Sequence, residues 1–98
     1  MSGGPVREAF VFVGRVQGVG FRATAAAIAV DLGLEGWVRN EPDGTVRCEV
    51  QGPPASIETF LSRLRGRMSE NLDSMSREPR AIEAGLGRFD VRRGPLGR

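Results

Sequence analysis

The sequence predicts an α+β domain with the element order β-α-β-β-α-β, in which two helices cover one face of an antiparallel sheet. Three observations predict this fold. The length of 98 residues suits one hydrophobic core, two segments carry apolar residues at helical spacing, and short β-forming segments flank both. Because no repeat or linker interrupts the chain, we expect residues 1–98 to form a single domain that is ordered over about residues 7–93.

The first strand is expected over residues 9–13, where β-forming residues are apolar on both faces, as in a central strand. A glycine-rich loop over residues 14–20 follows it. A helix is then expected from Phe21 until Gly33, because apolar residues recur there with helical spacing. Residues 1–6 and 94–98 are predicted to be loose ends.

A β-hairpin is expected next, with strands over residues 34–39 and 45–51 joined by a turn that contains the Asp43-Gly44 pair. Alternation in the second strand places Val46, Cys48 and Val50 on the core face and Arg47, Glu49 and Gln51 on the other. Cys48 is therefore predicted to be a buried thiol rather than a nucleophile.

A second helix is expected to begin at Pro53 and Pro54, since proline suits a first helical turn. Its apolar stripe consists of Ile57, Phe60, Leu61, Leu64 and Met68, and its arginines Arg63, Arg65 and Arg67 are predicted to form a solvated face. Two further strand candidates follow, residues 72–78 and 89–93, of which the second has the clearer pattern.

The composition excludes several kinds of chemistry, because the chain has no histidine, lysine or tyrosine. Serine triads with a histidine base, histidine metal sites, Schiff-base lysines and the phosphate-binding lysine of Walker motifs are all ruled out. The fourteen basic residues are all arginine, against twelve Asp and Glu. They are spread along the chain among the acids, so the sequence does not indicate a nucleic-acid surface.

A single cysteine, Cys48, cannot form an internal disulfide, which favours a reducing cytoplasm. The sequence has no apolar run of the roughly 18 residues that a membrane span needs, and its start lacks the apolar stretch of a signal peptide. Its carboxylates show no spacing that would build a metal site. We therefore expect a soluble cytoplasmic monomer that needs no metal, no cofactor and no membrane.

The glycine-rich loop over residues 14–20 has two interpretations. A loop that leaves a strand and enters a helix aims successive backbone N–H groups at one point, and Arg22 in the first helical turn could grip an anion held there. Alternatively, Gly14, Gly18 and Gly20 only permit positive φ angles in a tight turn, and Arg22 is a surface residue. The spacing alone does not separate these two interpretations.

Longer motifs add a family resemblance. GRVQGVGFR over residues 14–22, LGLEGWVRN over residues 32–40 and DGTV over residues 43–46 resemble the signatures of the acylphosphatase family, in the same order and spacing. The resemblance covers roughly residues 7–93 and is densest over residues 10–52. It implies a ferredoxin-like sandwich and the hydrolysis of small-molecule acyl phosphates to a carboxylate and inorganic phosphate.

The resemblance also implies roles for individual residues. Arg22 matches the phosphate-binding arginine of the family, and Asn40 matches the asparagine that holds the attacking water. The loop residues that would supply backbone donors are Arg15, Val16, Gln17, Gly18, Val19 and Gly20. The chain departs from the family at two positions where a hydroxyl residue is common, which here are Ala25 and Glu41.

The composition is compatible with that chemistry. A carboxylic-phosphoric anhydride expels a carboxylate whose conjugate acid has a pKa of about 4, so its departure needs no general acid. The protein must instead stabilise charge and align water. Without the motifs, Asn40 would be interpreted as a turn residue that caps its own backbone.

Three alternatives remain beside an acylphosphatase. The first is a phosphate- or nucleic-acid-binding module, but RNA-binding sheets stack bases on exposed aromatics, and most of the six here fall on predicted core faces. These six are Phe10, Phe12, Phe21, Trp37, Phe60 and Phe89. The second is a catalytically silent interaction domain. The third is a module taken from a larger carbamoyl-transferring maturation factor.

Overall fold

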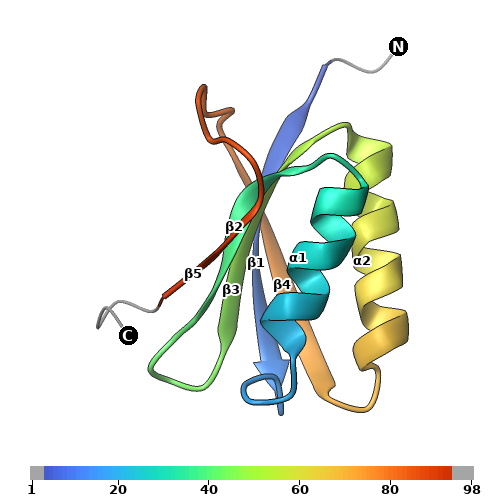
Figure 1. Cartoon of the computed structure of the whole chain (residues 1–98), viewed down its shortest axis with the longest axis vertical. Coiled ribbons are helices and arrows are strands. Elements are labelled where there is room, and N and C mark those ends of the chain that lie inside the picture. Colours follow the sequence, from blue (N-terminus) through green and yellow to red (C-terminus); the bar gives the residue numbers. More distant parts are fainter. Residues whose placement is uncertain (1–3, 94–98) are drawn as a thin grey trace.

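The computed structural model describes residues 4–93, in which two helices lie side by side on one face of a five-stranded sheet (Figure 1). The elements are β1 (Val6–Gly14), α1 (Phe21–Asp31), β2 (Glu35–Asn40), β3 (Val46–Gly52), α2 (Pro54–Met68), β4 (Leu72–Arg80) and β5 (Asp90–Arg92). The predicted α+β class and the predicted order of strands and helices are confirmed, with β5 as an added terminal strand.

The strand order across the sheet is β4-β1-β3-β2-β5. All neighbouring pairs are antiparallel except β2 and β5, which run parallel, so the sheet is mixed and the expected antiparallel sheet is wrong at this edge. The reason lies in the connection after β4. The chain leaves one edge of the sheet and crosses to the other, where a bridge joins Arg88 to Glu35 at the start of β2. β5 therefore runs in the same direction as β2.

The core lies between the sheet and the helices, as the two helical stripes predict. The buried residues of α2 are the five predicted ones, Ile57, Phe60, Leu61, Leu64 and Met68, and α1 buries Phe21, Ala25, Ile28 and Ala29. The strands meet them with Phe10, Phe12, Val46, Cys48 and Val50. The buried position of Cys48 is thus confirmed. Burial raises the pKa of this thiol far above its ordinary value, so the thiol stays protonated and is a poor nucleophile.

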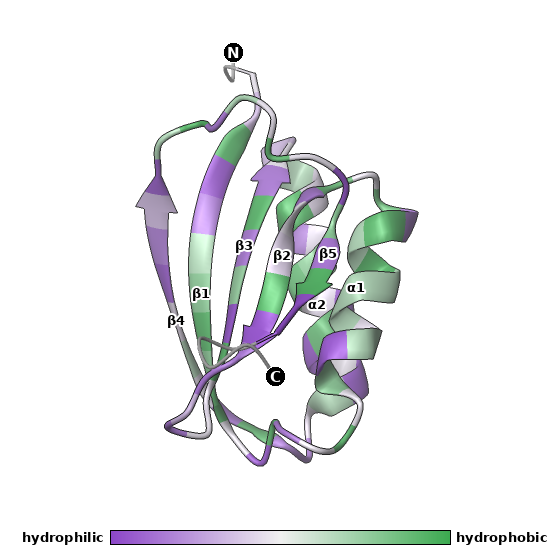
Figure 2. Cartoon of the chain, turned by 60° about the vertical axis from the view of Figure 1, so that its left-hand side comes forward, coloured by the Kyte–Doolittle hydropathy of each residue, from purple (hydrophilic) through white to green (hydrophobic). Residues whose placement is uncertain are grey.

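The last part of the chain differs most from expectation. The weak strand candidate at residues 72–78 is the nine-residue strand β4, which pairs with β1 along its length. It lies at a sheet edge where most side chains are exposed, and Figure 2 shows it as largely hydrophilic, so alternation could not mark it. β5 is shorter than the predicted residues 89–93, since Phe89 instead packs on Phe60 with ring centroids 6.3 Å apart.

The ends of the chain were expected to be loose over residues 1–6 and 94–98. Val6 belongs to β1, so that expectation is wrong at this residue, while residues 1–3 and 94–98 lie outside the described residues. Of the two helices in residues 4–93, neither is long and apolar enough to cross a membrane. The exposed arginines of α2 behave as expected of a solvated face, and Arg63 pairs with Asp31 of α1 at 2.8 Å.

Candidate active site

The loop that leads from β1 to α1 requires glycine at both of its ends. A Cβ atom on Gly14 would lie 2.3 Å from the carbonyl oxygen of Asn71, because the loop starts against the backbone that precedes β4. The neighbouring Arg15 N–H donates to that same oxygen at 2.8 Å, so this amide is already paired and the expectation that it donates to an anion is wrong. Gly20 caps α1 with a left-handed φ of 80°, which glycine adopts without steric cost. The strand is thereby joined to the helix through a tight loop that is fixed at its base.

The loop leaves its backbone donors free. Among the backbone hydrogen bonds of residues 4–93, none uses the N–H groups of residues 16–20, and the first bond of α1 runs from Thr24 N–H to Gly20 O at 3.0 Å. The N–H groups of the first helical turn are therefore also unpaired, as they are at any helix start. Free amides next to a helix N-terminus attract anions. This arrangement fits the anion-binding interpretation of the loop rather than the interpretation as a plain turn.

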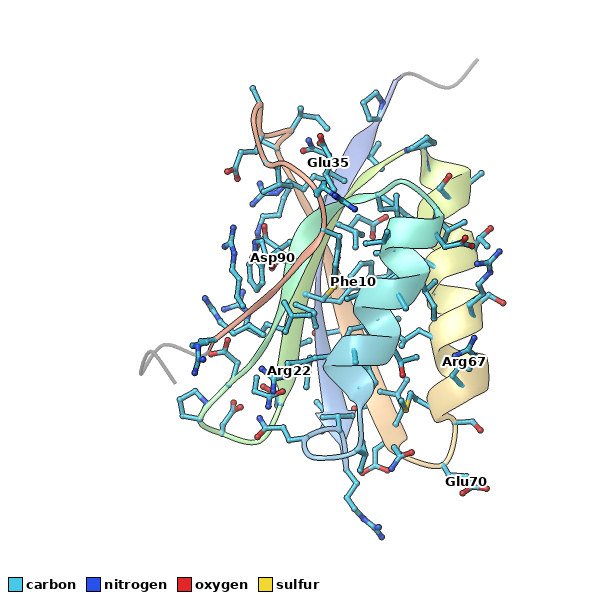
Figure 3. The ribbon with its side chains drawn as sticks, in the orientation of Figure 1. Phe10, Arg22, Glu35, Arg67, Glu70 and Asp90 are labelled. Atoms are coloured by element: carbon cyan, nitrogen blue, oxygen red, sulfur yellow. The ribbon has the colours of Figure 1, made fainter. Side chains whose placement is uncertain are left out.

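Arg22 and Asn40 line one cavity of about 220 Å³ together with this loop. Arg22 lies in the first turn of α1 and is half-exposed, and Figure 3 shows it near the end of the sheet where the loop enters the helix. Asn40 is the last residue of β2. The remaining lining residues are Val16, Gly18, Gly20, Phe21, Ala23 and Val91. Within residues 4–93, the ion pairs of the protein do not involve Arg22, so its charge is available to a ligand.

Asn40 does not cap the adjacent turn. Its Oδ1 atom is buried and has no hydrogen-bond partner within residues 4–93. The turn is capped by Asp43 instead, which accepts from the Thr45 N–H at 3.0 Å and from the Thr45 hydroxyl at 2.6 Å. These bonds hold the pKa of Asp43 below its ordinary value. An unpaired buried acceptor costs free energy, and such groups concentrate at functional sites.

Gln17 has a role that sequence reasoning missed. The family resemblance implies only that its backbone N–H donates to a phosphate. In the structure its side-chain Nε2 donates to Glu41 O at 2.8 Å and to Thr45 O at 2.9 Å. Both acceptors belong to the turn between β2 and β3, next to Asn40. The side chain therefore ties the anion-binding loop to the strand end that carries Asn40. The signal that the sequence offers is that Gln17 is the one side-chain amide in the loop over residues 14–20.

The two departures from the family pattern have local explanations. The Glu41 carboxylate accepts a hydrogen bond from Arg39 Nε at 2.6 Å, so its negative charge is offset beside the cavity. Ala25 is completely buried in the core, one turn after Arg22, and lies among apolar neighbours where a hydroxyl would need a partner.

Other kinds of site find little support in residues 4–93. No group of three or more Cys, Asp or Glu side chains is placed there to hold a metal ion. All six aromatic residues are buried, so the sheet presents no open aromatic surface on which RNA bases could stack.

Comparison with known proteins points in one direction. The chain matches the family model for acylphosphatase over residues 8–91. It is 40% identical over 89 residues to an acylphosphatase from Nitratidesulfovibrio vulgaris (strain DP4), covering 88% of this chain and 89% of the relative. It is 37% identical to an acylphosphatase from Syntrophotalea carbinolica, with 90% and 97% covered. The solved structure of an acylphosphatase from Coxiella burnetii superposes with a TM-score of 0.79 at 28% identity, with 91% and 94% covered.

Removing the Gln17 side chain tests its role as a tie between the loop and the turn. We expect Gln17→Ala to lower the free energy of unfolding by about 1–3 kcal/mol, because two hydrogen bonds are lost. It should also weaken the binding of inorganic phosphate by roughly 3- to 10-fold in calorimetry, since the loop amides lose their alignment.

The matched control is Gln51→Ala. The Gln51 Nε2 also donates twice, to Glu35 Oε1 and to Glu83 O, and its Oε1 accepts from the Glu83 N–H, but this side chain lies away from the cavity. This variant should lose stability and keep its affinity for phosphate. If Gln17→Ala bound phosphate as tightly as the unaltered protein, Gln17 would have no part in arranging the site.

Proposed function

The chain belongs to the acylphosphatase family, and we propose a mechanism by which it hydrolyses acyl phosphates to a carboxylate and inorganic phosphate. In this mechanism Arg22 and the free amides of residues 16–20 bind the phosphoryl group, while Asn40 orients the attacking water. One observation carries the proposal. A single cavity is lined by Arg22, Asn40 and the loop glycines Gly18 and Gly20, and the loop amides beside it are unpaired.

The phosphoryl group is held by charge and by backbone dipoles. The planar guanidinium of Arg22 donates two parallel N–H groups to two phosphoryl oxygens, a geometry that suits phosphate. The loop amides and the start of α1 bind the remaining oxygens. These donors are fixed in place before substrate binds, so they stabilise the charge that develops on the equatorial oxygens during transfer.

The water attacks phosphorus in line with the bond that breaks. Asn40 Oδ1 accepts a hydrogen bond from this water, which aims the water oxygen at phosphorus. A P–O bond forms to the water oxygen as the P–O bond to the acyl oxygen breaks. The electron pair leaves with the carboxylate. One water proton stays on the attacking oxygen and the other passes to a phosphoryl oxygen, so the products are a carboxylate and dihydrogen phosphate, which releases a proton to solvent according to the pH. Because the carboxylate is a weak base, no acid residue is needed.

We further propose that the enzyme acts as a cytoplasmic monomer and that it needs no metal ion. Every group assigned to the mechanism comes from one chain. Arg22 and the amides supply the positive potential that a metal would otherwise provide. The support for a reducing compartment is the single cysteine, Cys48, which lies buried as a free thiol.

A phosphate-release assay tests the activity. We expect acetyl phosphate or benzoyl phosphate to be hydrolysed and p-nitrophenyl phosphate to be left nearly untouched, since the phenolate leaving group is more basic. EDTA should leave the rate unchanged. The kcat should be nearly flat between about pH 6 and 8, because no proposed site residue titrates there. A bell-shaped profile near neutrality, or restoration of chelated enzyme by a divalent ion, would contradict the mechanism.

Arg22→Ala should lose most activity through loss of phosphate binding. A bidentate charged contact in a partly enclosed site contributes about 2–5 kcal/mol, so kcat/KM should fall by roughly 30- to 4,000-fold. Arg22→Lys should not restore it, because lysine lacks the planar fork. Arg67→Ala, an exposed arginine of α2, is the control for charge alone. Near-normal kcat/KM in the lysine variant would show that the proposed bidentate grip is wrong.

Asn40→Ala should act on the chemical step instead. We expect kcat to fall by on the order of 100-fold or more, while inorganic phosphate still inhibits with similar affinity. The comparison of kcat with the inhibition constant for phosphate separates this role from that of Arg22. A variant that kept its turnover and lost phosphate inhibition would reverse the two assignments.

A further inference from the structure

The sheet face that is turned away from the helices carries three arginines in one row. Arg39 of β2 is the register partner of Arg47 on β3 and of Arg92 on β5, so the three positions are adjacent across three neighbouring strands. The alternation of side chains places them on this outer face, because Val38, Val46 and Cys48 beside them are completely buried in the core. We call these three residues the arginine row.

Trp37 anchors two members of the row. The Arg39 Cζ lies 4.8 Å from the centroid of the Trp37 ring, and the Arg92 Cζ lies 5.1 Å from it. Both guanidiniums therefore pack on the same indole, which holds their long side chains through cation–π contact. Trp37 itself is only 7% exposed beneath them. Its ring is thus a support for the arginines rather than a free stacking surface.

Two of the three arginines of the row form no ion pair within residues 4–93. Arg39 pairs with Glu41 at 2.6 Å, but among the ion pairs of residues 4–93 none involves Arg47 or Arg92. Asp90 is also on this face, next to Trp37 in the neighbouring row, and Figure 3 shows it on the side of the sheet away from the helices. Like charges on adjacent strands destabilise a sheet. Folding thus assembles repulsive neighbours from distant parts of the sequence.

We propose that the arginine row binds a condensed phosphate chain, either inorganic triphosphate or the triphosphate tail of a nucleotide. Such a chain presents several phosphoryl groups in close succession, each of which suits the guanidinium fork. The strands that carry the arginines lie about 4.8 Å apart, closer than the about 6.6 Å that separates acidic side chains on one face of an extended peptide, so a ligand with more closely spaced charges suits the row better. Since the Trp37 ring is covered, it cannot stack on a nucleotide base. The phosphate chain alone therefore provides the contacts with the row.

This binding site is separate from the cavity of the hydrolytic reaction. Arg22 and Asn40 lie on the helix side of the sheet, and Arg39, next to Asn40 in β2, points to the other side. The inference therefore goes beyond acyl phosphate hydrolysis, and either can fail without the other.

Trp37 is the only tryptophan in the chain, so its fluorescence reports directly on the arginine row. We would titrate the full chain with sodium tripolyphosphate, with ATP and with a hexaglutamate peptide at low salt. Tripolyphosphate or ATP should change the emission of Trp37 in a saturable way that weakens as salt is raised. The tighter of the two identifies the source of the phosphate chain. Equal or tighter binding of hexaglutamate would overturn the proposal.

Variants then locate the ligand. The double variant Arg47→Gln with Arg92→Gln should bind the tighter phosphate ligand at least tenfold more weakly, keep its kcat on acetyl phosphate, and melt at the same temperature or roughly 1–4 °C higher, because repulsion is relieved. Arg65→Gln with Arg67→Gln removes equal charge from α2 and should bind normally. The Trp37 response should persist in Arg22→Ala. Loss of the response in Arg22→Ala, or equal weakening in the α2 variant, would overturn the proposal.

Discussion

The proposed active site depends on a loop whose backbone N–H groups are left unpaired and therefore do not stabilise the loop itself. A loop of this kind needs other contacts to keep its shape. Here the contacts are made by groups other than the unpaired amides of residues 16–20. The Arg15 N–H bonds to the backbone before β4, and the Gln17 side chain bonds twice to the turn after β2. The loop is thus held at Arg15 and at Gln17, and the backbone N–H groups of residues 16–20 remain free to bind an anion.

The end of β2 also pairs two opposite charges beside the cavity. Arg39, Asn40 and Glu41 are consecutive, and the alternation of β2 directs Arg39 away from the cavity that Asn40 lines. Glu41 is bound by Arg39. The carboxylate that follows Asn40 in sequence is in this way paired with a cation of the outer face, which leaves less negative charge to compete with the anionic substrate that we propose Arg22 binds. Arginine is well suited to this pairing with Glu41, because its charge does not change with pH.

Local patterns encode what could be predicted from the sequence. The apolar stripes of α1 and α2 and the Asp43-Gly44 hairpin follow from spacing alone, and the family motifs single out Arg22 and Asn40, which the structure brings to one cavity. Features set by tertiary register could not be predicted. The parallel pairing of β5 depends on where the connection after β4 arrives, and the bonds of Gln17 depend on the turn that it faces. The arginine row joins Arg39 and Arg47 of the hairpin to Arg92, which is far along the chain, and this explains why a scan for basic segments misses it.

The short strand β5 has a consequence for how the protein behaves at high concentration. Without it, β2 would be an open edge strand with unpaired backbone groups, ready to pair with another molecule. β5 covers Trp37, Val38 and Arg39 and, with three residues, is itself too short to offer a long template. At the opposite edge, β4 carries Pro79 among the charged residues Arg77, Glu78 and Arg80. Both edges thus disfavour edge-to-edge aggregation through their lengths and side chains, without a covering helix.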